Sequence, residues 1–191
     1  DGVAVTSSSL AVPGGTKLLA LPGVSADSLS HAINVPSHNE FADLTLHHLG
    51  YLDSQTSTNA AGFAAEIAAL NALGVPTSGL VLNDGSGLSH DNRVSPRHLI
   101  DLFVSLERQP EWPDFVHSLA VSGVRGTIAS RMTGANTWGR FWGKTGTLTG
   151  VITLSGVLFH AHDGQRYAAA FLLNGVSNST SARAALDAAV A

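Results

Sequence analysis

Apolar residues recur at helical intervals through the first half of the chain and at strand intervals near its end. Ala42, Leu46 and Leu49, for example, stand at i, i+4 and i+7, a spacing typical of one buried helix face. Similar stripes, bounded by proline or glycine, predict further helices. The expected helices are Ala26 to Asn34, Asn39 to Leu49, about Ala60 to Leu73, one from Ser95-Pro96 to before Pro110, Thr127 to Met132, and Thr180 to Val190.

Local signals predict where two of these helices begin or end. Asn59 is the candidate N-cap of the third helix, and Gly74 is its expected stop. Pro96 suits the first position of the fourth helix because its φ angle is already helical.

From Phe141 onward the pattern predicts a sheet. Three runs are rich in β-branched and aromatic residues, namely Phe141 to Thr147, Val151 to His162, and Arg166 to Leu173. Asp163-Gly164 is a hairpin turn signal between the last two. The middle run is apolar at odd and even positions alike, which a sheet with one wet face would not show. We therefore expect helices on both faces of the sheet.

Length and composition fit one well-packed domain or a part of one. The chain has 191 residues, 44% of them hydrophobic and 13% charged, with a net charge of −4. No basic block is present, so we expect no nucleic acid partner. No apolar run has the length of a membrane span. Cysteine is absent, which excludes disulfides and thiolate catalysis.

Nine histidines raise the possibility of a metal site. His47 and His48 are adjacent, so they would point apart on a helix. His160 and His162 would share one face of a strand, but the sequence shows no third ligand. We expect neither a metal nor a cofactor.

The stretch RFWGKTGTLTGV, from Arg140 to Val151, suggests an anion site. A phosphate-binding P-loop would need glycine at the position of Trp138 and a helix after the lysine. The chain has tryptophan there and continues as a strand, so a nucleotide is not the expected anion.

Two other strings carry candidate chemistry, PSHNEFAD from Pro36 and NDGSGLSHDNRVSP from Asn83. Each has an ordinary reading as well. Ser37 followed by Glu40 fits a capping box at a helix start. The Asp84 to Gly87 run is good turn chemistry, and it is either a structural loop beside a cleft or part of the catalytic site.

Taken together, the strings have a more specific meaning. Ser37-His38-Asn39 is a Ser-x-Asn motif, and Lys144-Thr145-Gly146 follows Ser37 by 107 residues. Ser-x-Asn and Lys-Thr-Gly are two of the three motifs of penicillin-binding proteins and serine β-lactamases. From about Leu18 to the C-terminus, the chain resembles the class C low-molecular-mass penicillin-binding proteins. These are the D-alanyl-D-alanine carboxypeptidase/endopeptidases of peptidase family S13.

The resemblance implies an α+β fold of the penicillin-binding protein and serine β-lactamase type. It implies an antiparallel sheet of five strands covered by helices on both faces, two of the strands coming from an earlier segment. Residues 1–191 would then be the C-terminal portion of one penicillin-recognising D,D-peptidase domain. A protein of this family acts on peptidoglycan in the cell envelope and is inhibited by β-lactam antibiotics.

The resemblance also assigns roles to six residues. Lys144 and Thr145 would bind the carboxylate of a D-Ala-D-Ala stem peptide or of a β-lactam. Gly146 would let the substrate backbone approach the strand, and the Thr147 N–H would belong to the oxyanion hole. Ser37 would relay a proton to the leaving nitrogen, and Asn39 would bond the substrate amide.

One family motif is absent from this sequence. The nucleophile and base lie in Ser-x-x-Lys, but the only lysines are Lys17 and Lys144, preceded three places earlier by Gly14 and Phe141. We expect that motif in a preceding N-terminal portion, on the same or a separate chain, which would be this chain's natural partner. The alternative is a non-catalytic peptidoglycan-binding module of the same fold.

Overall fold

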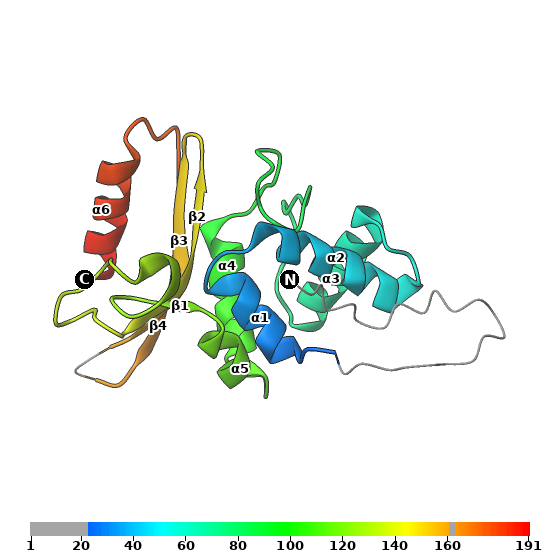
Figure 1. Cartoon of the computed structure of the whole chain (residues 1–191), viewed down its shortest axis with the longest axis horizontal. Coiled ribbons are helices and arrows are strands. Elements are labelled where there is room, and N and C mark those ends of the chain that lie inside the picture. The colour runs from blue at the N-terminus through cyan, green and yellow to red at the C-terminus, as the bar shows by residue number, and fades with distance from the viewer. Residues whose placement is uncertain (1–22, 161–162) are drawn as a thin grey trace.

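The computed structural model describes residues 23–160 and 163–191. Figure 1 shows a sheet with the α-helix α6 against one face and the other α-helices gathered on the opposite side. The elements are α1 (Ala26–Asn34), α2 (Asn39–Ser54), α3 (Asn59–Ala72), α4 (Pro96–Leu106), α5 (Trp112–His117), β1 (Ala120–Val121), a short 3₁₀ helix η1 (Gly126–Ile128), β2 (Phe141–Leu148), β3 (Val151–Phe159), β4 (Arg166–Asn174) and α6 (Ser179–Val190).

The sheet has four antiparallel strands in the order β1-β2-β3-β4 among the described residues. This confirms the three predicted strands. The middle strand ends at Phe159, and the predicted continuation to His162 runs into positions 161–162, which lie outside the described residues. β3 and β4 pair from Val151 opposite Asn174 to Phe159 opposite Arg166, so the predicted hairpin is present. The sequence does not predict β1, because a strand of two residues has no periodic pattern.

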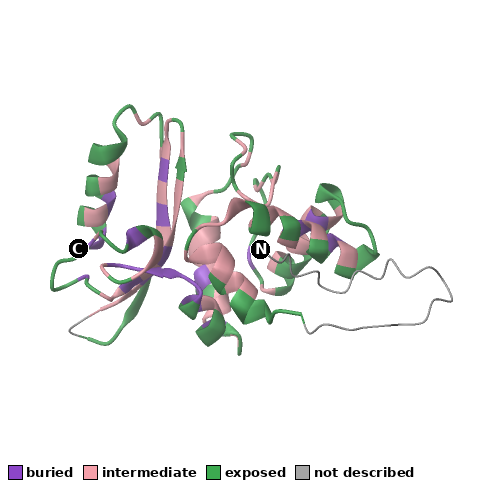
Figure 2. Ribbon diagram, viewed as in Figure 1, coloured by how far each residue is buried: buried purple, intermediate pink, exposed green. Residues whose placement is uncertain are grey.

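Apolar clusters on the two faces of the sheet hold the helices in place. On one face Ile152 and Leu154 of β3 pack with Leu186 and Val190 of α6. On the other face Val157 packs with side chains of α4 and α5, which are Phe103, Trp112 and Val116. Figure 2 shows buried segments in the strands of the sheet and in the helices beside it. The expected helical cover on both faces is confirmed.

Three helix predictions need correction. The N-cap of α3 is Thr58, whose hydroxyl accepts from the Ala61 N–H, and Asn59 is the first helical residue. The helix expected from Thr127 to Met132 is only the 3₁₀ turn η1 (Gly126–Ile128), and Met132, with a φ of 52°, has a left-handed backbone that is not helical. α5 was not predicted, although Pro113 occupies a position in its first turn that proline favours.

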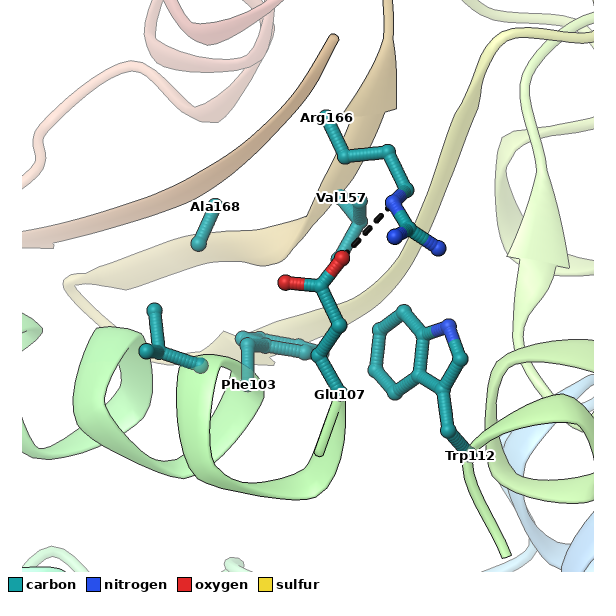
Figure 3. A pocket seen from close by; sticks show the side chains of 7 residues that line it. Phe103, Glu107, Trp112, Val157, Arg166 and Ala168 are labelled. Atoms are coloured by element: carbon teal, nitrogen blue, oxygen red, sulfur yellow. Dashed lines mark ion pairs between the residues drawn. The ribbon is translucent and has the colours of Figure 1, made fainter. Parts of the chain in front are cut away.

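A small cavity lies between α4, α5 and the sheet (Figure 3). Its volume is about 50 Å³, and Phe103, Trp112 and Val157 form much of its wall. Arg166 Nε and Glu107 Oε1 form an ion pair beside it at 2.6 Å. This space suits one or two water molecules, so it is too small for a peptide substrate.

Candidate functional site

Two of the predicted site residues meet where the start of α2 approaches strand β2. Lys144 Nζ donates to Ser37 Oγ at 2.6 Å and to the carbonyl oxygen of Thr145 at 2.9 Å. Ser37 and Lys144 are 107 residues apart in the sequence. The fold therefore joins the Ser-x-Asn motif to the Lys-Thr-Gly motif through a direct hydrogen bond.

Ser37 does not form the capping box that its spacing from Glu40 suggested. The N-cap of α2 is His38, and its side chain makes no cap hydrogen bond. Ser37 lies one residue earlier with a φ of 63°, and its hydroxyl accepts from Lys144 instead. A non-glycine residue in this left-handed region carries a strain of about 1–2 kcal/mol, and such strain often occurs at functional positions.

The Lys144 ammonium lacks a carboxylate partner among the described residues. Its side chain is half-buried, and burial lowers the pKa of the amino group, because the charged form loses water there. An ammonium has three N–H donors, and only two are used in these contacts. One donor and an unneutralised charge remain available to an anion.

The outer edge of β2 is open next to Lys144. Phe141 uses both its N–H and its carbonyl group toward Ser122, on the β1 side. Alternate residues of a strand direct their backbone groups to the same side, so Thr145 and Thr147 direct theirs to that edge as well. Along β2, β1 pairs with Trp142 and Gly143 and no later residue. Beyond Gly143, the edge that would receive an extended peptide is unpaired by strands of the described chain.

Thr145 makes a side-chain contact that sequence reasoning missed. Its Oγ1 lies 2.9 Å from the Oγ1 of Thr127, which belongs to η1. The two hydroxyl groups share one hydrogen bond, so one of them retains a free O–H. Nothing in the sequence pattern around Thr127 singles out this residue.

The structure provides a local reason for glycine at position 146. A Cβ on Gly146 would lie 2.4 Å from Thr153 Oγ1 on the neighbouring strand β3. The absence of a side chain therefore serves the packing of β2 against β3, whatever role it has toward a substrate.

Asn39 is the first residue of α2, two positions after Ser37. Its side chain is half-buried, and it makes no hydrogen bond within the described part of the chain. An amide group has two N–H donors and an acceptor oxygen, so Asn39 can bond a ligand near Ser37.

The Asp84 to Gly87 loop is tied to α2 by Asp43. Asp43 Oδ1 accepts from the backbone N–H groups of Gly85 and Ser86, each at 2.9 Å. The Asp84 carboxylate is occupied within its own loop, where it accepts from the N–H groups of Gly87 and Ser89. These contacts favour the structural reading of the loop over a catalytic one.

No cluster of three metal-ligating side chains occurs in residues 23–160 and 163–191. His160 Nδ1 lies 2.8 Å from Asp163 Oδ1, while His162, its predicted neighbour on the strand face, is outside the described residues.

Over the same ranges, no helix combines the length and the apolar character needed to cross a membrane.

Comparison with known proteins finds relatives that are named carboxypeptidases. It is 40% identical over 125 residues to a D-alanyl-D-alanine carboxypeptidase of Actinomadura sp., an alignment covering 63% of this chain and 23% of that protein. It is 30% identical over 141 residues to penicillin-sensitive carboxypeptidase A of Dictyostelium discoideum, covering 71% of this chain and 27% of that protein. The chain thus spans only about a quarter of the length of these relatives.

Solved structures show the same fold. Penicillin binding protein 4 (dacB) of Haemophilus influenzae, complexed with a β-lactam, superposes with a TM-score of 0.75 at 24% identity, covering 80% of this chain and 36% of that one. A second structure of that protein gives a TM-score of 0.72 at 25% identity, covering 80% of this chain and 34% of that one. The fold is therefore the α+β fold of penicillin-binding proteins. The family match extends over residues 14–191, and the chain belongs to the D-Ala-D-Ala carboxypeptidase 3 (S13) family.

Proposed function

We propose that this chain is the C-terminal portion of a serine D,D-peptidase domain that removes D-alanine from peptidoglycan stem peptides. The observation that carries the proposal is the 2.6 Å contact between Lys144 Nζ and Ser37 Oγ, beside the open edge of β2. It combines an unneutralised cation, a relay hydroxyl and a strand edge in one place.

In this proposal the terminal carboxylate of D-Ala-D-Ala binds Lys144 and the hydroxyl of Thr145. A hydrogen bond between an ammonium and a carboxylate is stronger than a neutral one. The rest of the peptide lies along β2 as an added strand, whose main-chain bonds provide affinity. A β-lactam presents the same carboxylate beside a reactive amide and occupies the same site.

The reaction proceeds through an acyl-enzyme. The serine of a Ser-x-x-Lys motif in the preceding segment attacks the carbonyl carbon of the penultimate D-alanine, and a lysine of that motif accepts its proton. The Thr147 N–H, directed at the open edge, stabilises the oxyanion. The C–N bond then breaks as Ser37 passes a proton to the leaving nitrogen. Water hydrolyses the ester and restores the serine.

Asn39 and Ser37 stand on the opposite side of the substrate from the β2 edge in this scheme. Asn39 bonds the substrate amide and helps to hold the upstream lysine. Ser37 connects that lysine to Lys144. This role explains why Ser37 keeps a strained backbone conformation, which places its hydroxyl against Lys144.

The preceding segment is also the proposed structural partner. β4 ends the sheet among the described residues, and its outer edge would accept the strands of an N-terminal portion, on the same chain or a separate one. Because the substrate is peptidoglycan, the assembled protein works in the cell envelope, outside the cytoplasm.

A non-catalytic peptidoglycan-binding module is the second candidate. Residues 1–191 contain no Ser-x-x-Lys, and in a module of this kind the whole protein would lack that motif. Such a module would keep the carboxylate site at Lys144 and lack the nucleophile.

Labelling with a fluorescent penicillin, followed by intact-mass spectrometry, tests the proposal. Full-length protein should gain the mass of one penicillin, whereas residues 1–191 alone should gain none. An adduct on residues 1–191 would reveal an unrecognised nucleophile and contradict the assignment. Full-length protein that binds D-Ala-D-Ala peptides without forming an adduct would support the module instead.

A further inference from the structure

Arg183 of α6 reaches the Lys-Thr-Gly strand from the face of the sheet opposite to Ser37. Its Nη2 lies 3.5 Å from Thr147 Oγ1, at the outer limit of a hydrogen bond. Thr147 is exposed and Arg183 half-buried, so both groups border solvent. The contact is too long to satisfy the guanidinium, which has five N–H donors.

Strand register places the two threonine hydroxyls under the same helix. Thr145 pairs with Leu154, and Thr147 pairs with Ile152, and paired residues of antiparallel strands project to the same face. Ile152 and Leu154 pack against α6. The threonine side chains therefore lie in a row on the α6 face of β2, and Arg183 stands at the end of that row.

Within residues 23–160 and 163–191, the Arg183 charge has no counterion. No ion pair of the described residues includes Arg183. The only acidic residue of α6 is Asp187, four positions later, where it could pair along the helix. Asp187 is instead held by Arg131, with Nη2–Oδ1 at 2.7 Å and Nε–Oδ1 at 3.1 Å.

We infer that Arg183 is a second cation of the carboxylate site and binds the terminal carboxylate of the substrate together with the hydroxyls of Thr145 and Thr147. The inference rests on the proposed function and extends it to a residue outside the three motifs. Lys144 approaches the edge of β2 from the Ser37 side, and Arg183 approaches it from the α6 side. A guanidinium fork matches the two oxygens of a carboxylate, so the site selects substrates with a free acid terminus.

The test measures that selectivity in the full-length protein. One substrate is an acylated peptide that ends in D-Ala-D-Ala, and the other is the same peptide with a C-terminal carboxamide. The readout is the ratio of kcat/KM for release of the terminal residue from the acid and from the amide. Because the ratio is taken within each protein, a loss of folded or active material cancels.

Arg183→Gln should lower the acid-to-amide ratio by about tenfold, in line with one charge-assisted bond. Arg183→Lys should retain part of the preference, because it keeps the charge and loses the fork. Arg97→Gln is the matched control, since Arg97 is an exposed arginine already paired with Asp101, and it should leave the ratio unchanged.

An acid-to-amide ratio in Arg183→Gln equal to that of the wild type would overturn this inference and leave the proposed function intact. A wild-type protein that releases neither terminal residue, or that shows no preference for the acid, would overturn the proposed function and this inference with it.

Discussion

Gly62 of α3 lies so close to Leu46 of α2 that no side chain fits between the two helices. A Cβ on Gly62 would lie 2.4 Å from the carbonyl oxygen of Leu46 and 2.7 Å from its Cγ. Gly50 of α2 makes the reciprocal approach, with a Cβ that would lie 2.6 Å from the Gly62 nitrogen. This close packing holds α2, whose start carries Ser37 and Asn39.

Gly62→Ala should therefore destabilise the protein. Overpacking costs about 1–3 kcal/mol, which outweighs the gain of up to about 1 kcal/mol that alanine brings to a helix interior. Denaturant unfolding of the full-length protein measures the difference. Gly134→Ala is the control, because its Cβ would meet only Thr137 Oγ1 at 3.9 Å. A Gly62→Ala protein as stable as the wild type would show that the helices can separate at little cost.

The left-handed backbone conformation of Ser37 leads to a second prediction. Both Ser37→Ala and Ser37→Gly lose the hydrogen bond to Lys144, but only glycine relieves the φ of 63°. Ser37→Gly should be more stable than Ser37→Ala by about 1 kcal/mol, whereas alanine would be favoured at an ordinary helical position. Equal stability of the two variants, measured by denaturant unfolding, would show that Ser37 is not strained.

Lys144 should make stability depend on pH. Burial lowers its folded-state pKa below the ordinary value of 10.5, so the unfolded chain binds more protons between the two pKa values. The free energy of unfolding should therefore rise with pH through that window, and the burial penalty should be fully present below it. Lys144→Met removes this titration.

The measurement is the difference in unfolding free energy between wild type and Lys144→Met, followed from pH 7 upward. That difference should move in favour of the wild type as the pH approaches 10.5. A difference that stays flat, or that moves against the wild type, would show that the ammonium is not penalised by burial.

The edge of β4 predicts dependence on the preceding segment. Its apolar run from Tyr167 to Leu173 borders no further strand in the described residues, and an unpaired apolar edge promotes aggregation. Residues 1–191 expressed alone should aggregate or unfold without a cooperative transition, and co-expression with the preceding segment should correct this. Gel filtration and thermal unfolding provide the readout. A monodisperse monomer with a sharp transition would contradict the proposal that strands of the preceding segment pair with β4.

The elements that sequence reasoning predicted well are those whose side chains repeat. α1 matches its predicted range, and β3 begins at the predicted Val151, because apolar periodicity reflects burial directly. β1 was missed because its strand character comes only from pairing with Trp142 and Gly143. Pairing of this kind is a tertiary contact without a local signal.

The candidate site also contains features that the sequence predicts and features that it does not. The six candidate residues followed from resemblance to a family, and the structure brings Ser37 and Lys144 into contact. The left-handed backbone of Ser37 could not be predicted, because serine before a helix ordinarily acts as a cap. The contacts of Thr127 and Arg183 could not be predicted from the sequence either, because each depends on how η1 or α6 packs against β2.

Lys144 should bind the substrate carboxylate during acylation of the full-length protein. The most direct test is the second-order rate of acylation by a fluorescent penicillin, in wild type and in Lys144→Ala, with Arg97→Ala as the control. Loss of a hydrogen bond to a charged group is worth about 1.5–3 kcal/mol, so the rate should fall roughly 10- to 150-fold. Lys144→Ala protein that acylates at the wild-type rate would contradict the account.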